Sequence, residues 1–364
     1  MGYSKEHANP LPRSLSDSGS RAFRVVAIGG GTGLSTLLKG LKWYVNPSAD
    51  RPTFPESGLP EISDLSAVVT VSDDGGSSGR LRKEFNMLPP GDVRNCIVAL
   101  SEDEALLSKL FQHRFAKGSG LEGHSFGNLF LTALTSITKD FSEAVRLSSE
   151  ILTTRGHIYP ATTSNVELEA LMDDGTRVRG ETKITASKGR IKELFLVPPD
   201  VEPLSQTLDA IAGADLITIG PGSLFTSLIP NLLVRGIAMA IASSAATKVY
   251  VCNLMTQANE SLGRSAADHI RALNKHAQAQ IFDYALLNSA PISDSLKAKY
   301  ALEGAAQVVV DEDAIRQLGV TPVLGDYLDE HEVARHDTSR IARDLMELVL
   351  KRQSAIGIGT TKSS

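Results

Sequence analysis

The chain has 364 residues, enough for two domains or for one large α/β sheet, and its 42% hydrophobic content supports a sizeable core. A formal net charge of −5 argues against a nucleic-acid partner, and no apolar run approaches the ~20 residues that cross a bilayer, which argues against membrane insertion. The two cysteines, Cys96 and Cys252, lie far apart without metal-ligand spacing and predict a cytoplasmic protein with buried free thiols.

The first elements alternate between apolar runs and proline- or glycine-rich connections. Residues 1–21 are rich in Ser, Pro and charge, and we expect them to form a disordered tail. A first strand is predicted at Arg24–Ile28 and a helix at Thr32–Tyr44. Asn46–Glu61 holds four prolines and is expected to form a surface insertion before a second strand, Leu65–Val71.

The next segment, from Gly79 to about Leu152, has helical periodicity, and a loop at Lys117–His124 interrupts it. Val166–Pro199 then alternates apolar and polar residues around turn signals, which predicts antiparallel hairpins and a small β subdomain within residues 160–200. After it the apolar β-branched runs of a parallel sheet resume. These further predicted strands are Leu216–Ile219, Lys248–Cys252, Asp283–Leu287 and Val308–Val310.

The chain is expected to close with an amphipathic helix at Ile341–Leu350 and a disordered tail at 353–364. The repeated strand–helix alternation predicts a Rossmann-like α/β fold, with a mostly parallel sheet, helices on both faces and a small antiparallel β insertion. We expect residues 22–352 to form a single domain that includes this insertion.

The first glycine-rich loop, Gly29-Gly30-Gly31-Thr32-Gly33, joins the first strand to the first helix. It matches the first two glycines of the dinucleotide fingerprint, with Leu34 where the third would fall. Unpaired amides at such a helix start donate hydrogen bonds to phosphate oxygens. The alternative interpretation is a tight turn without a ligand.

The second loop follows the second predicted strand and begins with Asp73 and Asp74. In a dinucleotide-binding fold a carboxylate at this point accepts hydrogen bonds from a ribose. Two adjacent carboxylates also suit Mg²⁺ beside phosphates, and Asp73 alternatively caps the following turn. Ser77 and Arg80, further along the loop, are suited to a phosphate or a carboxylate.

Two helix starts carry further polar residues. Asp92 is a natural N-cap within Leu88–Asn95. Ser125 is expected to cap the next helix, where Asn128 offers both a donor and an acceptor. His124 has no cysteine or second histidine at ligand spacing, which disfavours a metal role.

The third loop begins at Gly220-Pro221, after a predicted strand. The amides of Gly222, Ser223 and Leu224 are expected to be free at a helix start and to bind an anion. Ser223 lies in no Gly-x-Ser-x-Gly elbow and is interpreted as an oxyanion donor, so no catalytic residue is assigned.

The next strand end supplies two further polar side chains, Asn253 and Gln257.

The three glycine-rich loops together predict a phosphate-bearing ligand at the carboxyl edge of the sheet. A nicotinamide-dependent dehydrogenase is disfavoured because no proton donor stands out beside the glycine loops.

Together these segments closely resemble the YvcK-type gluconeogenesis factor family, relatives of the CofD-type 2-phospho-L-lactate transferases. The resemblance covers residues 24–346. The stretches that carry it are VVAIGGGTGLSTLLKGLK, VVTVSDDGGSSGRLR, LPPGDVRN, GHSFGNLFL, ADLITIGPGSLFTSLIPNLLV and VCNLMTQANES. The SDDGGSSGRLR and MTQ segments are more similar to the factor branch than to the transferase branch. Arg264 departs from the factor branch, which often has an aromatic residue at this position.

The resemblance implies a UDP-sugar-binding regulatory protein needed for growth on gluconeogenic carbon and for cell shape. Cell-wall synthesis proteins or further copies of the chain are then the expected partners. The alternative is a Mg²⁺-dependent transferase acting on a nucleotide-diphosphate-linked donor. The candidate ligand-binding residues are Gly30, Gly31, Thr32, Gly33, Asp73, Asp74, Ser77, Arg80, Asn128, Gly222, Ser223, Leu224, Asn253, Gln257 and Arg264, with Asp73 and Asp74 as the metal ligands if Mg²⁺ binds.

Overall fold

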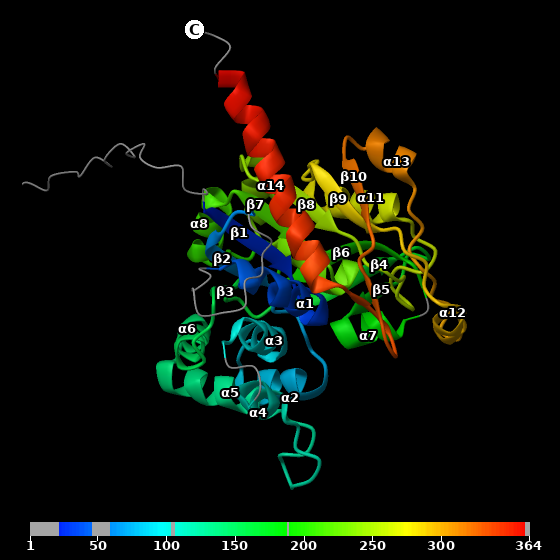
Figure 1. Ribbon diagram of the computed structural model, residues 1–364. Coiled ribbons are helices and arrows are strands. Elements are labelled where there is room, and N and C mark those ends of the chain that lie inside the picture. The colour runs from blue at the N-terminus through cyan, green and yellow to red at the C-terminus, as the bar shows by residue number, and fades with distance from the viewer. Residues whose placement is uncertain (1–21, 46–58, 103–105, 188, 361–364) are drawn as a thin grey trace, which may run out of the picture.

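The centre of the molecule is a seven-stranded parallel sheet (Figure 1). The computed structural model describes residues 22–45, 59–102, 106–187 and 189–360. The strands of this sheet are β1 Phe23–Gly29, β2 Ile62–Val69, β3 His157–Pro160, β7 Leu216–Ile219, β8 Thr247–Val251, β9 Tyr284–Asn288 and β10 Thr321–Gly325. All its neighbouring strands pair in parallel, so the predicted Rossmann-like α/β class is confirmed.

The strand order reverses beside β1. The sheet runs β10-β9-β8-β7-β1-β2-β3, so the chain builds outward from β1 on one side and from β7 on the other. In open α/β sheets, ligands bind outside the carboxyl ends of the strands at such a reversal. The first and third glycine loops follow β1 and β7 and therefore meet at this point.

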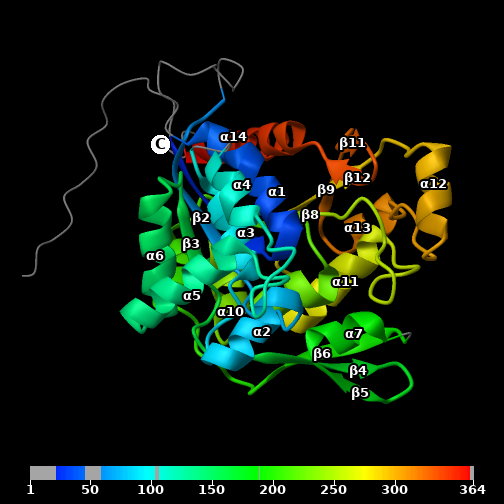
Figure 2. The ribbon, with the colours of Figure 1, turned by 90° about the horizontal axis from the view of Figure 1, so that it is seen from below.

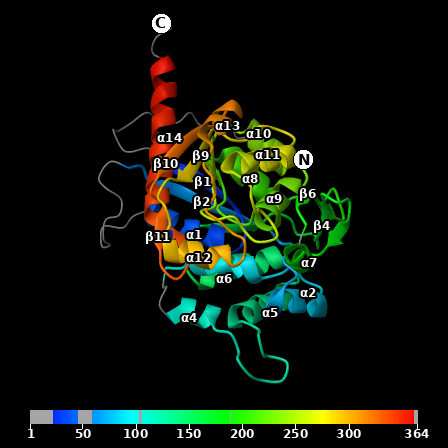
Figure 3. The ribbon, with the colours of Figure 1, turned by 90° about the vertical axis from the view of Figure 1, so that its right-hand side faces the viewer.

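Helices cover both faces of the sheet (Figure 3). One face carries α1 Gly31–Leu41, α3 Gly91–Leu100 and α14 Thr338–Thr360, and α1 packs against the other two. The other face carries α8 Ser205–Gly213, α9 Ile229–Leu233, α10 Ile237–Ser243 and α11 Ala266–Ala277. Between these layers β1 is buried from Val25 to Gly29, as expected for a central parallel strand with helices on both sides.

Four further helices form a lobe below the sheet together with α3 (Figure 1). They are α2 Gly76–Phe85, α4 Leu106–Gln112, α5 Phe126–Thr138 and α6 Phe141–Ile151. The predicted cap of α5 is confirmed, because the Asn128 amide donates to Ser125 Oγ over 3.3 Å. The loop predicted at Lys117–His124 is also present.

The predicted β insertion is a three-stranded antiparallel sheet of β4 Glu167–Met172, β5 Arg177–Arg179 and β6 Ile191–Val197. The sequence did not predict α7 Glu181–Ala186, which packs against β4 and β5 (Figure 2). A second unpredicted unit is the hairpin of β11 Leu328–Glu330 and β12 Ala334–His336.

The remaining elements are short. They are the 3₁₀ turn η1 Lys42–Tyr44, the π-helical turn η2 Leu224–Leu228, α12 Asp294–Ala301 and α13 Glu312–Gln317. In the described ranges no single helix is long and apolar enough to cross a membrane. The segments Leu224–Leu233 and Ile237–Ser243, bent by 81° relative to each other, reach the required length and composition only when counted together.

The strand predicted at Val308–Val310 is wrong. This segment is irregular, and its backbone bonds to Leu254 and Ala266 instead of to a sheet strand. The two edges of the sheet are formed by β10 and β3, and the sequence analysis predicted neither strand. Pro322 lies within β10, and proline is tolerated in a strand at an edge because it donates no ladder hydrogen bond.

Two predicted boundaries also changed. Helix α14 runs to Thr360, past the start of the tail expected at residue 353. Asp92 does not occupy the N-cap of α3, which is Pro90, but lies in the first helical turn. The tail at 1–21, most of the insertion (46–58) and residues 361–364 lie outside the described residues.

Candidate functional site

The first and third glycine loops touch each other at the strand-order reversal. A Cβ on Gly33 would overlap the carbonyl of Pro221, and a Cβ on Gly30 would lie 2.5 Å from Thr70 Cγ2. These two glycines are therefore needed for the loops to pack closely. Leu34, at the position of the missing third glycine, is fully buried beneath them.

A cleft of about 700 Å³ opens at this contact. It brings together predicted residues from both loops and from the end of β8. They are Gly30, Gly31, Thr32, Gly33, Gly222, Ser223, Asn253 and Gln257. The far rim comes from elements that the sequence analysis did not connect with the site, namely Tyr300 of α12 and His336 of β12. Burial lowers the pKa of His336 to about 4, so this side chain is neutral at pH 7.

The third loop is held by Asn253. The Gly222 amide donates to Asn253 Oδ1 over 2.9 Å, and Asn253 Nδ2 donates to the Gly222 carbonyl over 2.7 Å. The expectation that the Gly222 amide is free is therefore wrong. Gln257 Nε2 donates to Ser223 Oγ over 2.8 Å, so both polar residues after β8 position the loop.

Glu260 also binds the third loop, and the sequence analysis missed it. Its Oε1 accepts the amides of Phe225 (3.0 Å) and Thr226 (2.9 Å) at the start of η2. Burial raises the pKa of Glu260. Because Phe225 and Thr226 are capped in this way, the amides of Ser223 and Leu224 are the ones left without a partner among the described residues.

The two aspartates of the second loop are engaged by the protein. Asp73 Oδ1 accepts the Gly75 amide over 2.9 Å, which confirms the turn-capping alternative. Asp74 Oδ1 accepts the Thr182 amide (2.9 Å) and the Thr182 hydroxyl (2.6 Å), and so joins the loop to α7. No group of three or more His, Cys, Asp or Glu residues in the described ranges is arranged to hold a metal ion. The hydrogen bonds that Asp73 and Asp74 accept within the described residues use Oδ1 of each side chain, and Mg²⁺ takes one or two carboxylates beside phosphates, so a magnesium site at this pair stays a prediction.

The cleft is lined by carboxyl groups, whereas its described lining contains no Lys or Arg. Burial and the nearby charge of Asp73 raise the pKa of Asp92 to about 7, although a backbone hydrogen bond with Gly31 opposes this shift. Burial, followed by the surrounding carboxylates, raises the pKa of Glu181 on α7 to about 9. Near pH 7 Glu181 therefore holds a proton, and Asp92 titrates close to this pH.

Seven predicted residues are absent from the lining of the cleft: Asp73, Asp74 and Leu224, described above, and Ser77, Arg80, Asn128 and Arg264. Ser77, Asn128 and His124 form a buried network beneath α2, in which Asn128 Nδ2 donates to Ser77 Oγ over 3.1 Å and Ser77 Oγ lies 2.9 Å from His124 Nδ1. Arg80 is exposed, and its Nη2 donates to the Glu122 carbonyl over 2.7 Å. Arg264 donates to the Ile191 carbonyl, and its guanidinium lies over the Phe225 ring at 5.1 Å.

Comparison with known proteins agrees with this architecture. The family described as 2-phospho-L-lactate transferase CofD matches residues 25–328. The gluconeogenesis factor of Halalkalibacterium halodurans is 49% identical over 334 residues, which is 91% of this chain and 98% of that protein. The gluconeogenesis factor of Bacillus subtilis is 46% identical over 327 residues, 90% of this chain and 98% of that protein.

The fold is likewise similar to that of a solved protein. A crystal structure of a Bacillus halodurans protein has a TM-score of 0.83 and 49% sequence identity, and the match covers 90% of this chain and 100% of the other. The chain therefore belongs to the CofD family, among the gluconeogenesis factors within it.

Proposed function

We propose that the chain is a regulatory protein that binds a nucleotide diphosphate sugar of the UDP-sugar type in the cleft between the first and third glycine loops. In this proposal binding serves the cell-shape role on gluconeogenic carbon that the family resemblance implies. The signal then passes to cell-wall synthesis proteins or between copies of the chain.

The observation that carries the proposal is a set of four backbone amides that find no partner within the described part of the chain. They belong to Thr32 and Gly33 at the start of α1, and to Ser223 and Leu224 before and within η2. Amides that converge from two helix starts suit the oxygens of a diphosphate. The cleft volume of about 700 Å³ is within the usual range for a ligand that carries a base and a sugar.

The carboxyl lining supports a proton-linked form of binding. Asp92 lies against the first loop and Glu260 against the third, so each loop already holds an internal carboxyl group. A protonated carboxyl can donate a hydrogen bond to a phosphate oxygen, whereas a carboxylate repels it. The cleft is therefore suited to a diphosphate when these groups carry protons.

The test is calorimetric titration with UDP-N-acetylglucosamine and UDP-glucose, followed by mass spectrometry of the recovered ligand. We expect saturable binding and unchanged ligand. A thermal-shift comparison with GDP and NAD ranks the candidates, because a ligand present at 100 times its dissociation constant adds about 2.7 kcal/mol of stability. The proposal would be overturned if neither UDP-sugar binds. Conversion of the ligand would favour the transferase alternative.

A further inference from the structure

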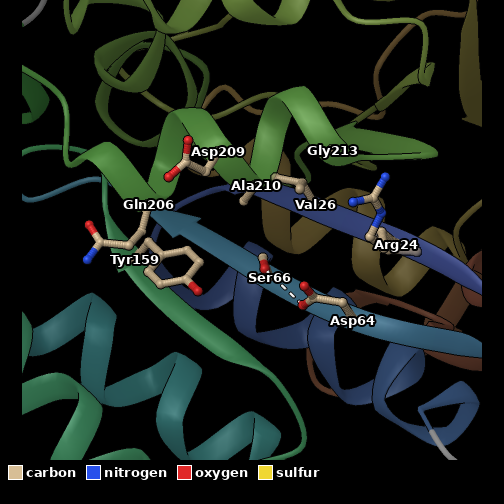
Figure 4. Close-up of a pocket in the computed structure, with 10 residues that line it drawn as sticks. Arg24, Val26, Asp64, Ser66, Tyr159, Gln206, Asp209, Ala210 and Gly213 are labelled. Carbon is tan, nitrogen blue, oxygen red and sulfur yellow. Dashed lines mark hydrogen bonds between the residues drawn. The ribbon is translucent and has the colours of Figure 1, made fainter. Parts of the chain in front are cut away.

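A second cavity lies on the half of the sheet away from the glycine loops. Its volume is about 310 Å³. The strands β1, β2 and β3 form its floor and α8 forms its wall (Figure 4). The two cavities lie at opposite ends of β1. Arg24 and Val26, near the start of the strand, line this cavity, whereas Gly30, just after its end, lines the cleft between the glycine loops.

The floor of this cavity is unusually polar for a parallel sheet. In the strand register Arg24 pairs with Asp64, Val26 with Ser66, and Val68 with Tyr159. Because side chains alternate along a strand, Arg24, Asp64, Ser66 and Tyr159 share one face. Parallel strands covered by helices are normally apolar on both faces. Here small residues of α8, Ala210 and Gly213, leave space above the polar face.

The charged groups of the cavity do not neutralise one another. The Arg24 guanidinium lies against Gly213, where a Cβ would come within 2.7 Å of Nη1, and its side chain forms no ion pair with a described residue. Asp64 accepts one hydrogen bond, from Ser66 Oγ over 3.2 Å. On α8, Asp209 has no side-chain partner among the described residues.

Both carboxylates act on the tyrosine at the end of the cavity. Burial raises the pKa of Tyr159, and the charges of Asp64 and Asp209 raise it further. The Tyr159 hydroxyl and the Gln206 amide are therefore neutral hydrogen-bonding groups within a negative field. With one Arg and two Asp, the lining has a net charge of −1 and favours a ligand of net charge +1.

We propose that this cavity binds a free basic α-amino acid of the lysine class. Arg24 and Asp64 are register neighbours on adjacent strands, and no ion pair joins them within the described residues, so one cation and one anion are available side by side for the carboxylate and the ammonium of one amino acid. Asp209, on the opposite wall, binds the side-chain cation. The cavity volume is at the lower end for small-molecule sites, as a single amino acid requires.

The test is calorimetric titration of the full chain with lysine, with norleucine, which lacks the side-chain ammonium, and with cadaverine, which lacks the carboxylate. We expect lysine to bind at least about tenfold more tightly than either analogue, because each analogue loses one charge-assisted contact. Asp209→Asn should weaken lysine binding about tenfold and leave norleucine binding unchanged. Arg24→Gln should reduce the preference for lysine over cadaverine.

Glu202→Gln is the matched control, because Glu202 precedes α8 and pairs with Arg235 at the surface outside the cavity. It should leave lysine binding unchanged. Failure of lysine to bind, equal binding of lysine and norleucine, or equal losses in Asp209→Asn and Glu202→Gln would each overturn the proposal. None of these outcomes depends on whether UDP-sugars bind in the cleft.

Discussion

Asn253 shapes the cleft through the backbone of the third loop. Both polar groups of its side-chain amide bond to Gly222, one donating and the other accepting. The next two residues, Ser223 and Leu224, then have backbone amides that no described residue pairs with. Asn253 is thus a positioning residue for the site, whereas its residue type alone suggested direct contact with a ligand.

Replacing Asn253 by Ala should weaken UDP-sugar binding by about 1–3 kcal/mol, because the Gly222 amide and carbonyl lose their partners and the loop loses its geometry. Calorimetry measures the affinity, and circular dichroism checks that the variant is folded. Gln317→Ala, which removes an exposed amide at the end of α13, is the control and should bind as the wild type does. Unchanged affinity in Asn253→Ala would show that the two hydrogen bonds between Asn253 and Gly222 do not matter for binding.

At the scale of elements, α7 is joined to the second loop by one carboxylate. Asp74 Oδ1 accepts both the amide and the hydroxyl of Thr182, while Asp74 Oδ2 lies where a Cβ on Gly180 would come within 2.7 Å. Gly180 also has a φ of +100°, which glycine adopts readily. The arrangement holds Glu181 and Thr185 at the cleft.

Thr182→Val should loosen α7, because it removes the hydroxyl bond to Asp74 and keeps the backbone bond. We expect faster hydrogen exchange in Glu181–Ala186 and a loss of about 1 kcal/mol in UDP-sugar affinity. Thr176→Val removes a comparable Thr–Asp contact in the β4–β5 turn, away from the cleft, and serves as the control. Equal hydrogen-exchange rates of Glu181–Ala186 in the two variants would show that the Thr182–Asp74 bond does not hold α7 in place.

At the scale of the whole molecule, the cleft concentrates carboxyl groups from separate parts of the chain. Asp92 comes from α3, Glu181 from α7 and Glu260 from the segment before α11. Each has a raised pKa, and burial is the first cause in every case. Folding therefore brings together groups that resist ionisation, which links both stability and anion binding to pH.

Stability should fall as the pH rises from about 6 to about 9, by about 1.4 kcal/mol per pH unit for each proton that only the folded state retains. The folded pKa values of Asp92 (about 7) and Glu181 (about 9) exceed the ordinary values of 3.8 and 4.5. Across this range the folded state retains protons that the unfolded state has already lost, so raising the pH favours unfolding. Thermal midpoints measured against pH test this sign.

Asp92→Asn and Glu181→Gln should each flatten the pH profile, because each removes one ionising group. Glu303→Gln changes an exposed carboxylate at the cleft rim and should keep the wild-type slope. A wild-type midpoint that rises over this pH range would contradict the raised pKa values.

The sequence alone determined the class of fold and the edge of the sheet at which the cleft lies. Buried β-branched runs such as Val25–Ile28 and Leu216–Ile219 are local signals of parallel strands, and the glycines after them mark sharp turns. The connection order of such strands then places the loops at one edge. Short or proline-bearing pieces, including β10 and the hairpin β11–β12, carried too little periodic signal to be recognised.

Only the tertiary structure decided which polar groups face the cleft and which serve the protein itself. Asn253 and Gly222 are 31 positions apart, and Asp74 and Thr182 are 108 apart, so no local pattern reports their pairing. The roles of Glu260 and Asp92 likewise depend on neighbours supplied by distant segments. Residue type sets what a side chain can bond to, but the partner that it meets, and the pKa that results, depend on how remote elements pack.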